Sequence, residues 1–339
     1  MKLLITGGSG FIGSNFILYM IEKYPKYSFV NLDKLTYAGN LETLKSVEND
    51  PRYTFIHGDI CNRDDVERAM DGVDIVVHFA AESHVDRSIT GPAVFVQTNV
   101  IGTQILLDAA KENKVKRFHH VSTDEVFGSL SLDNPEVKFT EETPYNPHSP
   151  YSASKAGSDH LVRAYHDTYG LPITISNCTN NYGPYQFPEK VIPLFITNAM
   201  NDKPLPIYGT GKAVRDYIFV TDHCAGIDLI IHKGKDGETY CLGGHAEMNG
   251  LEVAETILKA TGKPESLKTF VKDRKGHDMR YAIDDSKIRR ELGYKPSVDF
   301  EEGIKQTIDW YRNNQEWWSR IISKEYLDTT RAEQNKTRD

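Results

Sequence analysis

Two short segments carry side chains whose types and spacing suit redox and proton-transfer chemistry. Thr123, Asp124 and Glu125 follow directly after a predicted strand that ends at Ser122, and Tyr151 and Lys155 come later in the chain. A tyrosine placed four residues before a lysine can take the proton of a hydroxyl group while a hydride leaves the same carbon. Expulsion of water from a sugar also needs an acid and a base, and Asp124 and Glu125 can supply one each. Together the segments indicate dehydration built on hydride transfer.

The tyrosine–lysine spacing is not rare in this chain. It occurs at Tyr19 with Lys23, at Tyr151 with Lys155 and at Tyr208 with Lys212. Only Tyr151 opens a predicted helix beside a predicted cleft, with Lys155 one turn further on the same face. An ammonium at roughly 6 Å, with an effective dielectric constant of about 20, stabilises a phenolate by about 3 kcal/mol. We therefore expect Lys155 to lower the pKa of Tyr151.

The acidic residues also fit a second interpretation, a solvated loop. If the strand before them continued, Thr123 and Glu125 would share one face and Asp124 would point to the other. A turn directly after Ser122 would instead direct all three side chains into one cleft. The catalytic hypothesis requires that turn.

The first half of the chain alternates between predicted strands and predicted helices. Segments rich in β-branched and aromatic residues predict strands at 2–6, 28–33, 53–57, 74–80, 117–122 and 173–178. Apolar residues at helical spacing predict helices at 11–24, 63–70, 93–113 and 151–169. This order is typical of the α/β class, with a doubly wound, parallel Rossmann-type sheet. Such sheets bind ligands at the carboxyl ends of their strands.

The pattern changes after residue 183. Prolines become frequent, and the later strand-like segments are short and separated. Helices are predicted at 189–201, 221–232, 251–261 and 300–313. We expect a first domain at 1–183, to whose sheet later strands can return, and a smaller α/β substrate lobe at 184–323. A frayed tail is expected at 324–339, because it has few large apolar residues.

A glycine-rich loop follows the first predicted strand. Gly7, Gly10 and Gly13 allow a tight turn, close approach to a pyrophosphate and packing of helix against strand. Asp33 ends the second predicted strand, where a carboxylate accepts hydrogen bonds from the ribose hydroxyls and repels a 2′-phosphate. The loop therefore predicts an NAD-binding domain and favours NAD over NADP, against the weaker opposite influence of Lys34.

Composition limits the classes of partner and ligand. The chain has 40 Lys and Arg against 48 Asp and Glu, and a net charge of −8 argues against binding nucleic acid. Its four cysteines form no paired motif, which favours buried thiols over a zinc site or a disulfide framework. His119 and His120 are adjacent on a predicted strand and would point to opposite faces, so we expect no metal. Neither a signal peptide nor an apolar run of about 20 residues is recognised, so we expect a cytoplasmic protein without a membrane partner.

Several longer runs resemble the extended short-chain dehydrogenase/reductase family, and within it the dTDP-glucose 4,6-dehydratases. The runs are 7–14, 32–40, 80–88, 122–126, 151–155, 180–185, 189–190, 274 and 276–278. Ser9, Phe127 and Lys275 depart from the residues usual in that family, and none of them belongs to the proposed chemistry. The resemblance implies a homodimeric lyase, paired through helices at 93–113 and 151–169. It also implies NAD as a regenerated cofactor and dTDP-glucose as the substrate.

The resemblance implies a role for each catalytic candidate. Tyr151, held by Lys155 and with Thr123 near the sugar, would remove the proton of the carbon 4 hydroxyl as hydride passes to NAD. Glu125 would take the carbon 5 proton, and Asp124 would protonate the departing carbon 6 hydroxyl. Return of the hydride to carbon 6 would give a 4-keto-6-deoxy sugar, a precursor of rhamnose-type deoxysugars.

The same resemblance implies the binding residues. Those expected at NAD are Gly7, Gly10, Phe11, Ile12, Gly13, Asp33, Lys34, Leu35, Thr36, Asp59, Ile60, Phe79, Ala80, Ala81, Thr98, Tyr151, Lys155 and Asn181. Those expected at the nucleotide sugar are Ser83, Thr123, Asn180, Lys190, Val191, Pro206, Ile207, Tyr208, Arg215, Asn249, Asp273, Arg274, Lys275, Gly276 and His277. Asn249 stands one place before Gly250, which occupies the position where the family has an asparagine.

Two other interpretations remain open at this level. A nucleotide-sugar epimerase or decarboxylase of the same fold would use Tyr151 and Lys155 without needing Asp124 and Glu125. An NAD-sensing protein without chemistry would need none of these four. The base of the nucleotide and the pathway that consumes the product do not follow from the residues themselves.

Overall fold

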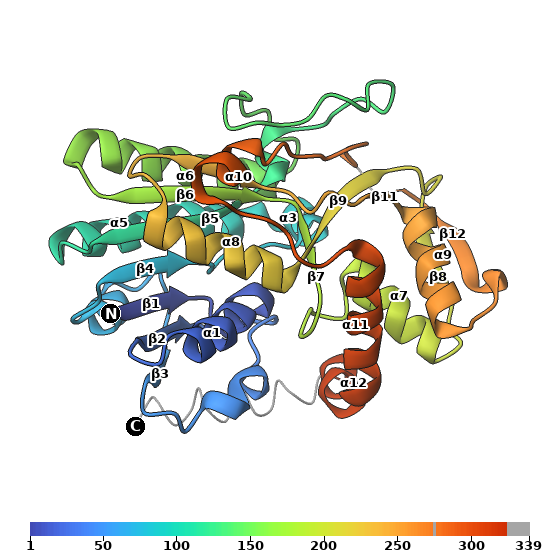
Figure 1. Cartoon of the computed structure of the whole chain (residues 1–339), viewed down its shortest axis with the longest axis horizontal. Coiled ribbons are helices and arrows are strands. Elements are labelled where there is room, and N and C mark those ends of the chain that lie inside the picture. Colours follow the sequence, from blue (N-terminus) through green and yellow to red (C-terminus); the bar gives the residue numbers. More distant parts are fainter. Residues whose placement is uncertain (274–275, 324–339) are drawn as a thin grey trace.

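The computed structural model describes residues 1–273 and 276–323 of the 339-residue chain. Its centre is a seven-stranded parallel sheet in the order β10-β6-β5-β4-β1-β2-β3 (Figure 1). The strands are β1 (Lys2–Thr6), β2 (Ser28–Asp33), β3 (Tyr53–His57), β4 (Ile75–His78), β5 (Arg117–Thr123), β6 (Ile173–Cys178) and β10 (Thr239–Leu242). The expected α/β class with a doubly wound Rossmann-type sheet is confirmed.

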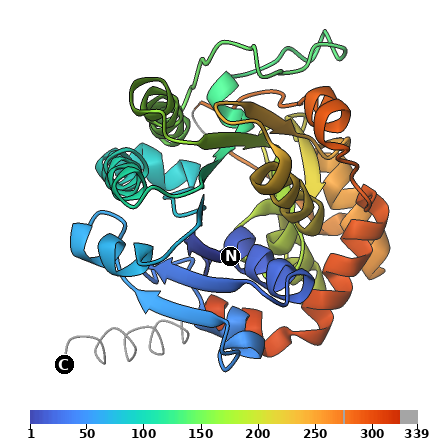
Figure 2. The ribbon, with the colours of Figure 1, turned by 60° about the vertical axis from the view of Figure 1, so that its left-hand side comes forward.

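Helices cover both faces of this sheet, because its strands present apolar side chains on both sides. On one face, Leu3 and Ile5 of β1 pack with α1 (Phe11–Lys23) and α8 (Val220–Lys233). On the other, Leu4 packs with α2 (Arg63–Met70), α5 (Thr103–Glu112) and α6 (Pro150–Tyr169). In Figure 2, α5 and α6 lie to the left of the sheet and α1 and α8 to its right.

A smaller lobe lies at the carboxyl ends of the central strands (Figure 1). One of its sheets joins β7 (Asn180–Tyr182), β9 (Val214–Phe219) and β11 (Glu247–Asn249), and the other joins β8 (Leu205–Tyr208) and β12 (Lys268–Val271). Its helices are α7 (Val191–Met200), α9 (Gly250–Thr261), α11 (Phe300–Asn313) and α12 (Gln315–Ser323). They share one apolar core that includes Tyr182, Phe195, Ile257, Tyr311 and Trp318.

The chain crosses between the two lobes more than once. After β9, α8 packs on the central sheet, and β10 then pairs with β6 at the edge of that sheet. α10 (Ser286–Leu292) joins the same face through Ile288. Residues 184–323 therefore do not all belong to the smaller lobe, because the apolar residues of α8 and β10 complete the core of the first. The tail expected at 324–339 lies outside the described residues.

The helix predicted at 93–113 is made of three parts. α4 (Pro92–Phe95), a π-helical segment (Val96–Gly102) and α5 follow one another. Among residues 1–273 and 276–323, this stretch is the one helix with the length and mean hydropathy of a membrane span, and 44% of the apolar window is buried inside the protein. Helices in the core of a globular fold share these properties.

Candidate active site

The loop between β1 and α1 forms a cradle because its glycines lack a Cβ. Gly7 has a φ of +71°, and a Cβ there would lie 2.7 Å from the backbone of Ala80. A Cβ at Gly13 would lie 2.4 Å from the carbonyl oxygen of Gly7. α1 begins at Phe11 with no side-chain cap, so its first N–H groups are free to bind a ligand. Such a loop and helix end suit a phosphate group.

Asp33 ends β2 beside this cradle and is held in place by the backbone. Its two carboxylate oxygens accept the N–H groups of Ser9 and Leu35, each at 2.8 Å. Burial raises the pKa of Asp33, and these two hydrogen bonds oppose the rise. The neighbouring Lys34 lies with Nζ 2.7 Å from the carboxylate of Asp59. The lysine is therefore engaged by another carboxylate, and Asp33 stays available to a ribose.

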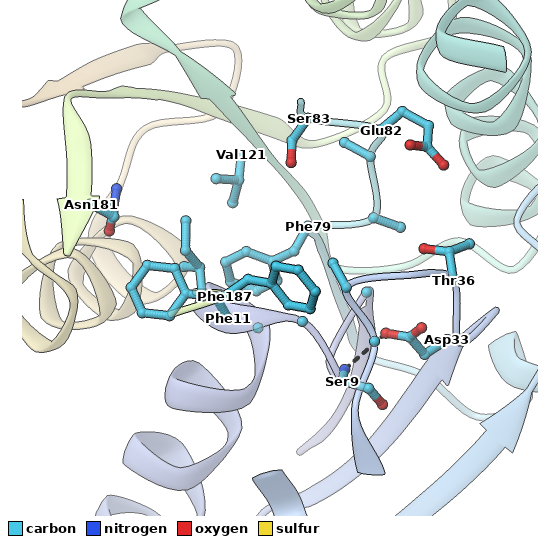
Figure 3. Close-up of a pocket in the computed structure, with 18 of the residues that line it drawn as sticks. Ser9, Phe11, Asp33, Thr36, Phe79, Glu82, Ser83, Val121, Asn181 and Phe187 are labelled. Atoms are coloured by element: carbon cyan, nitrogen blue, oxygen red, sulfur yellow. Dashed lines mark hydrogen bonds between the residues drawn. The ribbon is translucent and has the colours of Figure 1, made fainter. Parts of the chain in front are cut away.

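Figure 3 shows the cleft above the glycine loop, with Phe11 and Phe187 at one side and Asp33 and Thr36 at the other. All the residues expected at NAD line this cleft except Leu35. The side chain of Leu35 is buried, and its N–H binds Asp33. A glycine cradle and a carboxylate for the ribose in one cleft fit an NAD molecule.

β5 continues to Thr123 and then turns, which brings three consecutive side chains to the cleft. Asp124–Phe127 form one turn of 3₁₀ helix, and Oγ1 of Thr123 accepts the N–H of Glu125 at 3.3 Å. Thr123, Asp124 and Glu125 all line the cleft. The alternation of a continuing strand, with Asp124 on the opposite face, does not occur. The turn required by the catalytic hypothesis is present.

Asp124 is surrounded by groups that disfavour its ionised form. It is 1% exposed, and its Oδ2 has no hydrogen-bond partner among the described residues. Burial raises the pKa of Asp124 well above its usual value, and the charge of Glu125 raises it further. The surroundings of Asp124 therefore favour its protonated form, which can donate a proton.

α6 directs Tyr151 into the same cleft. A capping box fixes its first turn, with Ser149 and Ser152 each bonding the other's backbone N–H. The expectation that the pKa of Tyr151 is lowered is wrong for the protein alone. Burial raises this pKa well above its ordinary value, and the charge of Glu125 adds to the effect. The prediction considered only the attraction between the phenolate and the ammonium of Lys155. It left out the loss of solvation on burial and the repulsion by the nearby carboxylate of Glu125.

Lys155 lies one turn further along α6 and is also buried. Its Nζ donates to the carbonyl oxygen of Val121 at 2.8 Å and lies 3.3 Å from Nε2 of His120. An ammonium has three donors, so one remains for the cleft that Lys155 lines. Burial lowers the pKa of Lys155, whereas the charge of Asp159 opposes this decrease.

Some of the residues expected at the nucleotide sugar lie in this cleft. They are Ser83, Thr123, Asn180 and Lys190. Nζ of Lys190 is 3.4 Å from the carbonyl oxygen of Ser83. Since Ser83 belongs to the first lobe and Lys190 precedes α7, the two lobes meet at this point.

Other expected substrate residues form a second group at the β8–β12 sheet. Pro206, Ile207 and Tyr208 belong to β8, and Asp273 follows β12. Nδ1 of His277 is 2.7 Å from Oδ1 of Asp273, and the ring of His277 meets that of Tyr208 edge-on. None of this group lines the cleft, nor do Val191, Arg215, Asn249 and Gly276, while Arg274 and Lys275 lie outside the described residues.

Asn249 has a structural partner that the spacing did not show. Its Oδ1 accepts the N–H groups of Leu251 and Glu252, each at 3.0 Å, and so caps α9. The carboxylate of Glu252 accepts the N–H of Asn249 in return. This side chain is therefore used by the helix and not directed at the cleft.

Arg215 lies near Asp124 without lining the cleft. It donates to the carbonyl oxygens of Val214 and Asp278, and its guanidinium stacks 4.2 Å from the centre of the Tyr281 ring. Its charge lowers the pKa of Asp124 against the larger, opposite effect of burial. Arg215 is therefore close enough to influence the acid although it is not part of the cleft lining.

One wall of the cleft was not predicted. The guanidinium carbon of Arg87 lies 3.5 Å from the centre of the Tyr37 ring, and Nη2 of Arg87 donates to Glu189 at 3.1 Å. Tyr37, Phe187 and Glu189 line the cleft, as does Trp317 of α12. Tyr37 and Glu189 stand in runs that carried the family resemblance and could have been chosen on that ground. Trp317 stands in none, because α12 reaches the cleft only through the tertiary fold.

The histidines of β5 serve hydrogen bonding. His119 bonds the hydroxyl groups of Thr174 and Ser176 at 2.9 and 3.1 Å, whereas His120 lies beside Lys155. The two side chains thus point to opposite faces of the sheet. In the described part of the chain, no cluster of three or more His, Cys, Asp or Glu residues is arranged to hold a metal ion.

Comparisons with known proteins agree with this site. The family model for GDP-mannose 4,6 dehydratase matches residues 4–307. The dTDP-glucose 4,6-dehydratase of Escherichia coli is 50% identical in an alignment that covers 96% of this chain and 98% of that protein. The enzyme of the same name from Haemophilus influenzae is 52% identical, over 93% of this chain and 98% of its own length.

Solved structures give the same result. DesIV, a dTDP-glucose 4,6-dehydratase from Streptomyces venezuelae with NAD bound, has a TM-score of 0.92 and 50% identity, covering 95% of this chain and all (100%) of its own. UDP-glucose 4-epimerase from Thermotoga maritima has a TM-score of 0.86 at 29% identity, covering 93% of this chain and 100% of its own. The resemblance seen in the sequence is confirmed: this chain belongs to the GDP-mannose 4,6 dehydratase family and, within it, to the dTDP-glucose 4,6-dehydratases.

Proposed function

We propose that this protein is an NAD-dependent lyase that converts dTDP-glucose to dTDP-4-keto-6-deoxyglucose and water. The observation that carries the proposal is that Asp124, whose burial favours the protonated form, lies next to Glu125 in the same cleft as Tyr151. Relatives that are 50% identical over nearly their whole length are named for this activity. The product is a precursor of rhamnose-type deoxysugars.

The first step is oxidation at carbon 4 of the glucose. NAD, when bound, accepts the hydrogen of carbon 4 as hydride and later returns it to carbon 6. Tyr151 takes the proton of the carbon 4 hydroxyl, and Thr123 orients the sugar. Because burial disfavours the phenolate, the basic form of Tyr151 depends on the positive charge of Lys155.

The second step is elimination across carbons 5 and 6. The ketone at carbon 4 makes the carbon 5 proton acidic, and Glu125 removes it. Asp124 donates its proton to the hydroxyl group that leaves carbon 6, so water departs. One proton is taken and one is given, which is why the two adjacent carboxyl groups need different protonation states. Glu125 returns its proton to carbon 5 when the hydride is delivered to carbon 6.

The nucleotide diphosphate extends from the cleft into the smaller lobe. We assign Ser83, Asn180 and Lys190 to the sugar end and the group at the β8–β12 sheet, with Arg215, to the nucleotide end. Lysine and arginine form charge-assisted hydrogen bonds that suit a diphosphate. The first domain then binds NAD, and the smaller lobe binds the nucleotide sugar.

An epimerase of the same fold is the main alternative. It would need Tyr151 and Lys155, but it has no use for an acid beside a base because no hydroxyl leaves the sugar. The burial that raises the pKa of Asp124 therefore favours dehydration. A protein that only senses NAD would need none of these side chains in the cleft.

We also propose a cytoplasmic homodimer. Ile89, Val94, Val96 and Ile101, on α3 (Val85–Thr90) and the helical stretch after it, are at least 40% exposed. An apolar helix surface of this kind suits a second copy of the same chain. All four cysteines are free, which suits a reducing compartment.

Incubation of the NAD-loaded protein with dTDP-glucose tests the proposed function. Mass spectrometry should show loss of one water molecule, with UDP-glucose and GDP-mannose as matched controls of nucleotide preference. Tyr151→Phe should abolish both the reduction of NAD and the product. Failure of the unmodified protein to dehydrate dTDP-glucose would refute the proposal, and full activity of Tyr151→Phe would refute the role of that residue.

A further inference from the structure

Behind Lys155, on the side away from the cleft, lies a buried polar cluster that the proposed reaction does not use. Three groups approach Nε2 of His120. They are Nζ of Lys155 at 3.3 Å, Oγ of Ser158 at 3.2 Å and Oδ1 of Asp159 at 3.1 Å. Neither His120 nor Asp159 has any exposed side-chain surface. One imidazole nitrogen thus lies within 3.3 Å of both a buried ammonium and a buried carboxylate.

Asp159 is bound by neutral hydroxyl groups on one side only. Its Oδ2 accepts the hydroxyl groups of Ser122 and Tyr145, each at 2.8 Å. Its Oδ1 has no hydrogen-bond partner among the described residues and faces His120. A carboxylate in the interior needs a compensating positive charge. Lys155, whose Nζ approaches the same imidazole nitrogen as Asp159, supplies that charge.

The arrangement follows from the sequence of α6. Tyr151, Lys155 and Asp159 are each four residues apart, so they lie along one face of the helix. Phenol, ammonium and carboxylate therefore form a line that runs from the cleft into the core. His120 of β5 completes this line between its second and third members.

We propose that Asp159, acting through His120, holds Lys155 in place and keeps it protonated for its task beside Tyr151. Asp159 and His120 are positioning residues, since they touch neither the sugar nor the NAD site. The inference rests on the proposed function, because it concerns the base of the oxidation step.

The other groups around Lys155 do not supply a negative charge. Cys178 of β6 faces it, and burial raises the pKa of that thiol to about 12. Burial lowers the pKa of His120 to about 4, and that of His78, whose ring lies 5.2 Å from the ring of His120, is also lowered by burial. Burial alone would raise the pKa of Asp159, but His120, Lys155 and Ser122 outweigh it and the pKa is lowered. Arg163 reaches the cluster only through the hydroxyl of Tyr145, to which it donates at 2.8 Å.

Replacing Asp159 by Asn tests the inference because it keeps the shape and removes the charge. Without the carboxylate the ammonium of Lys155 loses its proton at lower pH. In the pH profile of kcat for dTDP-glucose dehydration, the decrease at high pH (the alkaline limb) should then occur about one pH unit lower. At neutral pH, kcat should decrease about tenfold with KM unchanged. Asp159→Glu, which restores the charge, should return the alkaline limb toward that of the unmodified protein.

Tyr145→Phe is the matched control, since it removes one hydrogen bond to the same carboxylate and leaves the charge. Its alkaline limb should not move. If Asp159→Asn does not fold, Asp159→Ser, which is smaller and also removes the charge, should show the same shift. A decrease of kcat without movement of the limb in these variants would overturn the inference while the unmodified protein still dehydrates dTDP-glucose. Absence of dehydration by the unmodified protein would instead refute the proposed function.

Discussion

At the scale of single residues, the proposed reaction depends on two adjacent carboxyl groups with different environments. Burial favours the protonated form of Asp124, whereas Glu125 lies next to it at the cleft. The same short turn can therefore donate a proton at carbon 6 and accept one from carbon 5. Each of these roles has its own consequence when the side chain is changed to an amide.

Glu125→Gln removes the base and leaves the oxidation at carbon 4 intact. The rate of product formation should decrease by a factor of roughly 10² to 10⁴. NADH should accumulate after mixing with dTDP-glucose and be detected by its absorbance. Glu142→Gln, at an exposed position on the loop before α6, is the control and should turn over normally. Undiminished turnover by Glu125→Gln would show that another group takes the carbon 5 proton.

Asp124→Asn should abolish elimination and at the same time stabilise the protein at alkaline pH. The pKa of Asp124 is raised in the folded state, so its protonated form stabilises folding. That contribution is complete below the ordinary carboxyl pKa and is lost as the pH rises through the raised one. Because Asn has no proton to lose, the variant should gain about 1–3 kcal/mol in the free energy of unfolding relative to the unmodified protein at alkaline pH.

Urea denaturation of both proteins at neutral and alkaline pH measures this difference. The gain should shrink as the pH falls below the raised pKa, because unfolding releases the proton of Asp124 and this release becomes less favourable at lower pH. A variant that is less stable at alkaline pH would contradict the assignment of Asp124 as a buried acid.

The sequence showed which residue types could do the chemistry, but it could not show where their side chains point. Whether Thr123, Asp124 and Glu125 share a cleft depends on where β5 ends, and the 3₁₀ turn at Asp124–Phe127 decides it. The pKa of Tyr151 was predicted in the wrong direction for the protein alone. Burial is a property of the whole fold, and the spacing to Lys155 does not contain it.

At the scale of elements, a polar side chain that caps a helix is not available to bind the ligand. Asn249 caps α9 with two hydrogen bonds, so Asn249→Ala should cost about 1 kcal/mol in the free energy of unfolding. The KM for dTDP-glucose should not change. Asp299→Ala removes a cap of the same kind from α11, where Oδ1 accepts the N–H of Glu302 at 2.9 Å, and should behave alike. An increased KM with unchanged stability would show instead that Asn249 contacts the substrate.

Elements whose stability is local were predicted well. The strands at 2–6, 28–33, 53–57 and 173–178 and the helix at 63–70 agree with the structure at both ends. The strand at 74–80 ends earlier, at His78, where the chain turns to line the cleft. The π-helical segment was not predicted, because it coincides with contacts between elements: Asn99 accepts the N–H of Glu82 and donates to Ser154, each at 2.9 Å.

At the scale of the whole molecule, the return of the chain from the smaller lobe to the central sheet could not be predicted from the sequence. β10 has four residues and joins β6, more than sixty residues earlier in the chain. So short a strand has little pattern of its own. Its place is fixed by the edge that β6 offers and by the packing of α8 on α1, both of which are long-range contacts.

The proposed homodimer makes a prediction at the same scale. Val96 is 51% exposed on the apolar helix surface, so Val96→Glu should convert the dimer to a monomer because it places a charge in the interface. Light scattering coupled to size-exclusion chromatography measures the mass. Val137→Glu introduces the same charge at a site that is 46% exposed in a distant loop and should remain dimeric. A monomeric unmodified protein would contradict the proposal.

The central claim is a closed redox cycle in which hydrogen moves within one sugar. dTDP-glucose labelled with deuterium at carbon 4 tests it most directly. The account predicts that the label appears at carbon 6 of the 4-keto-6-deoxy product, with no net formation of NADH. Recovery of the label at carbon 4 of an epimer would contradict it and assign the cleft to the epimerase reaction instead.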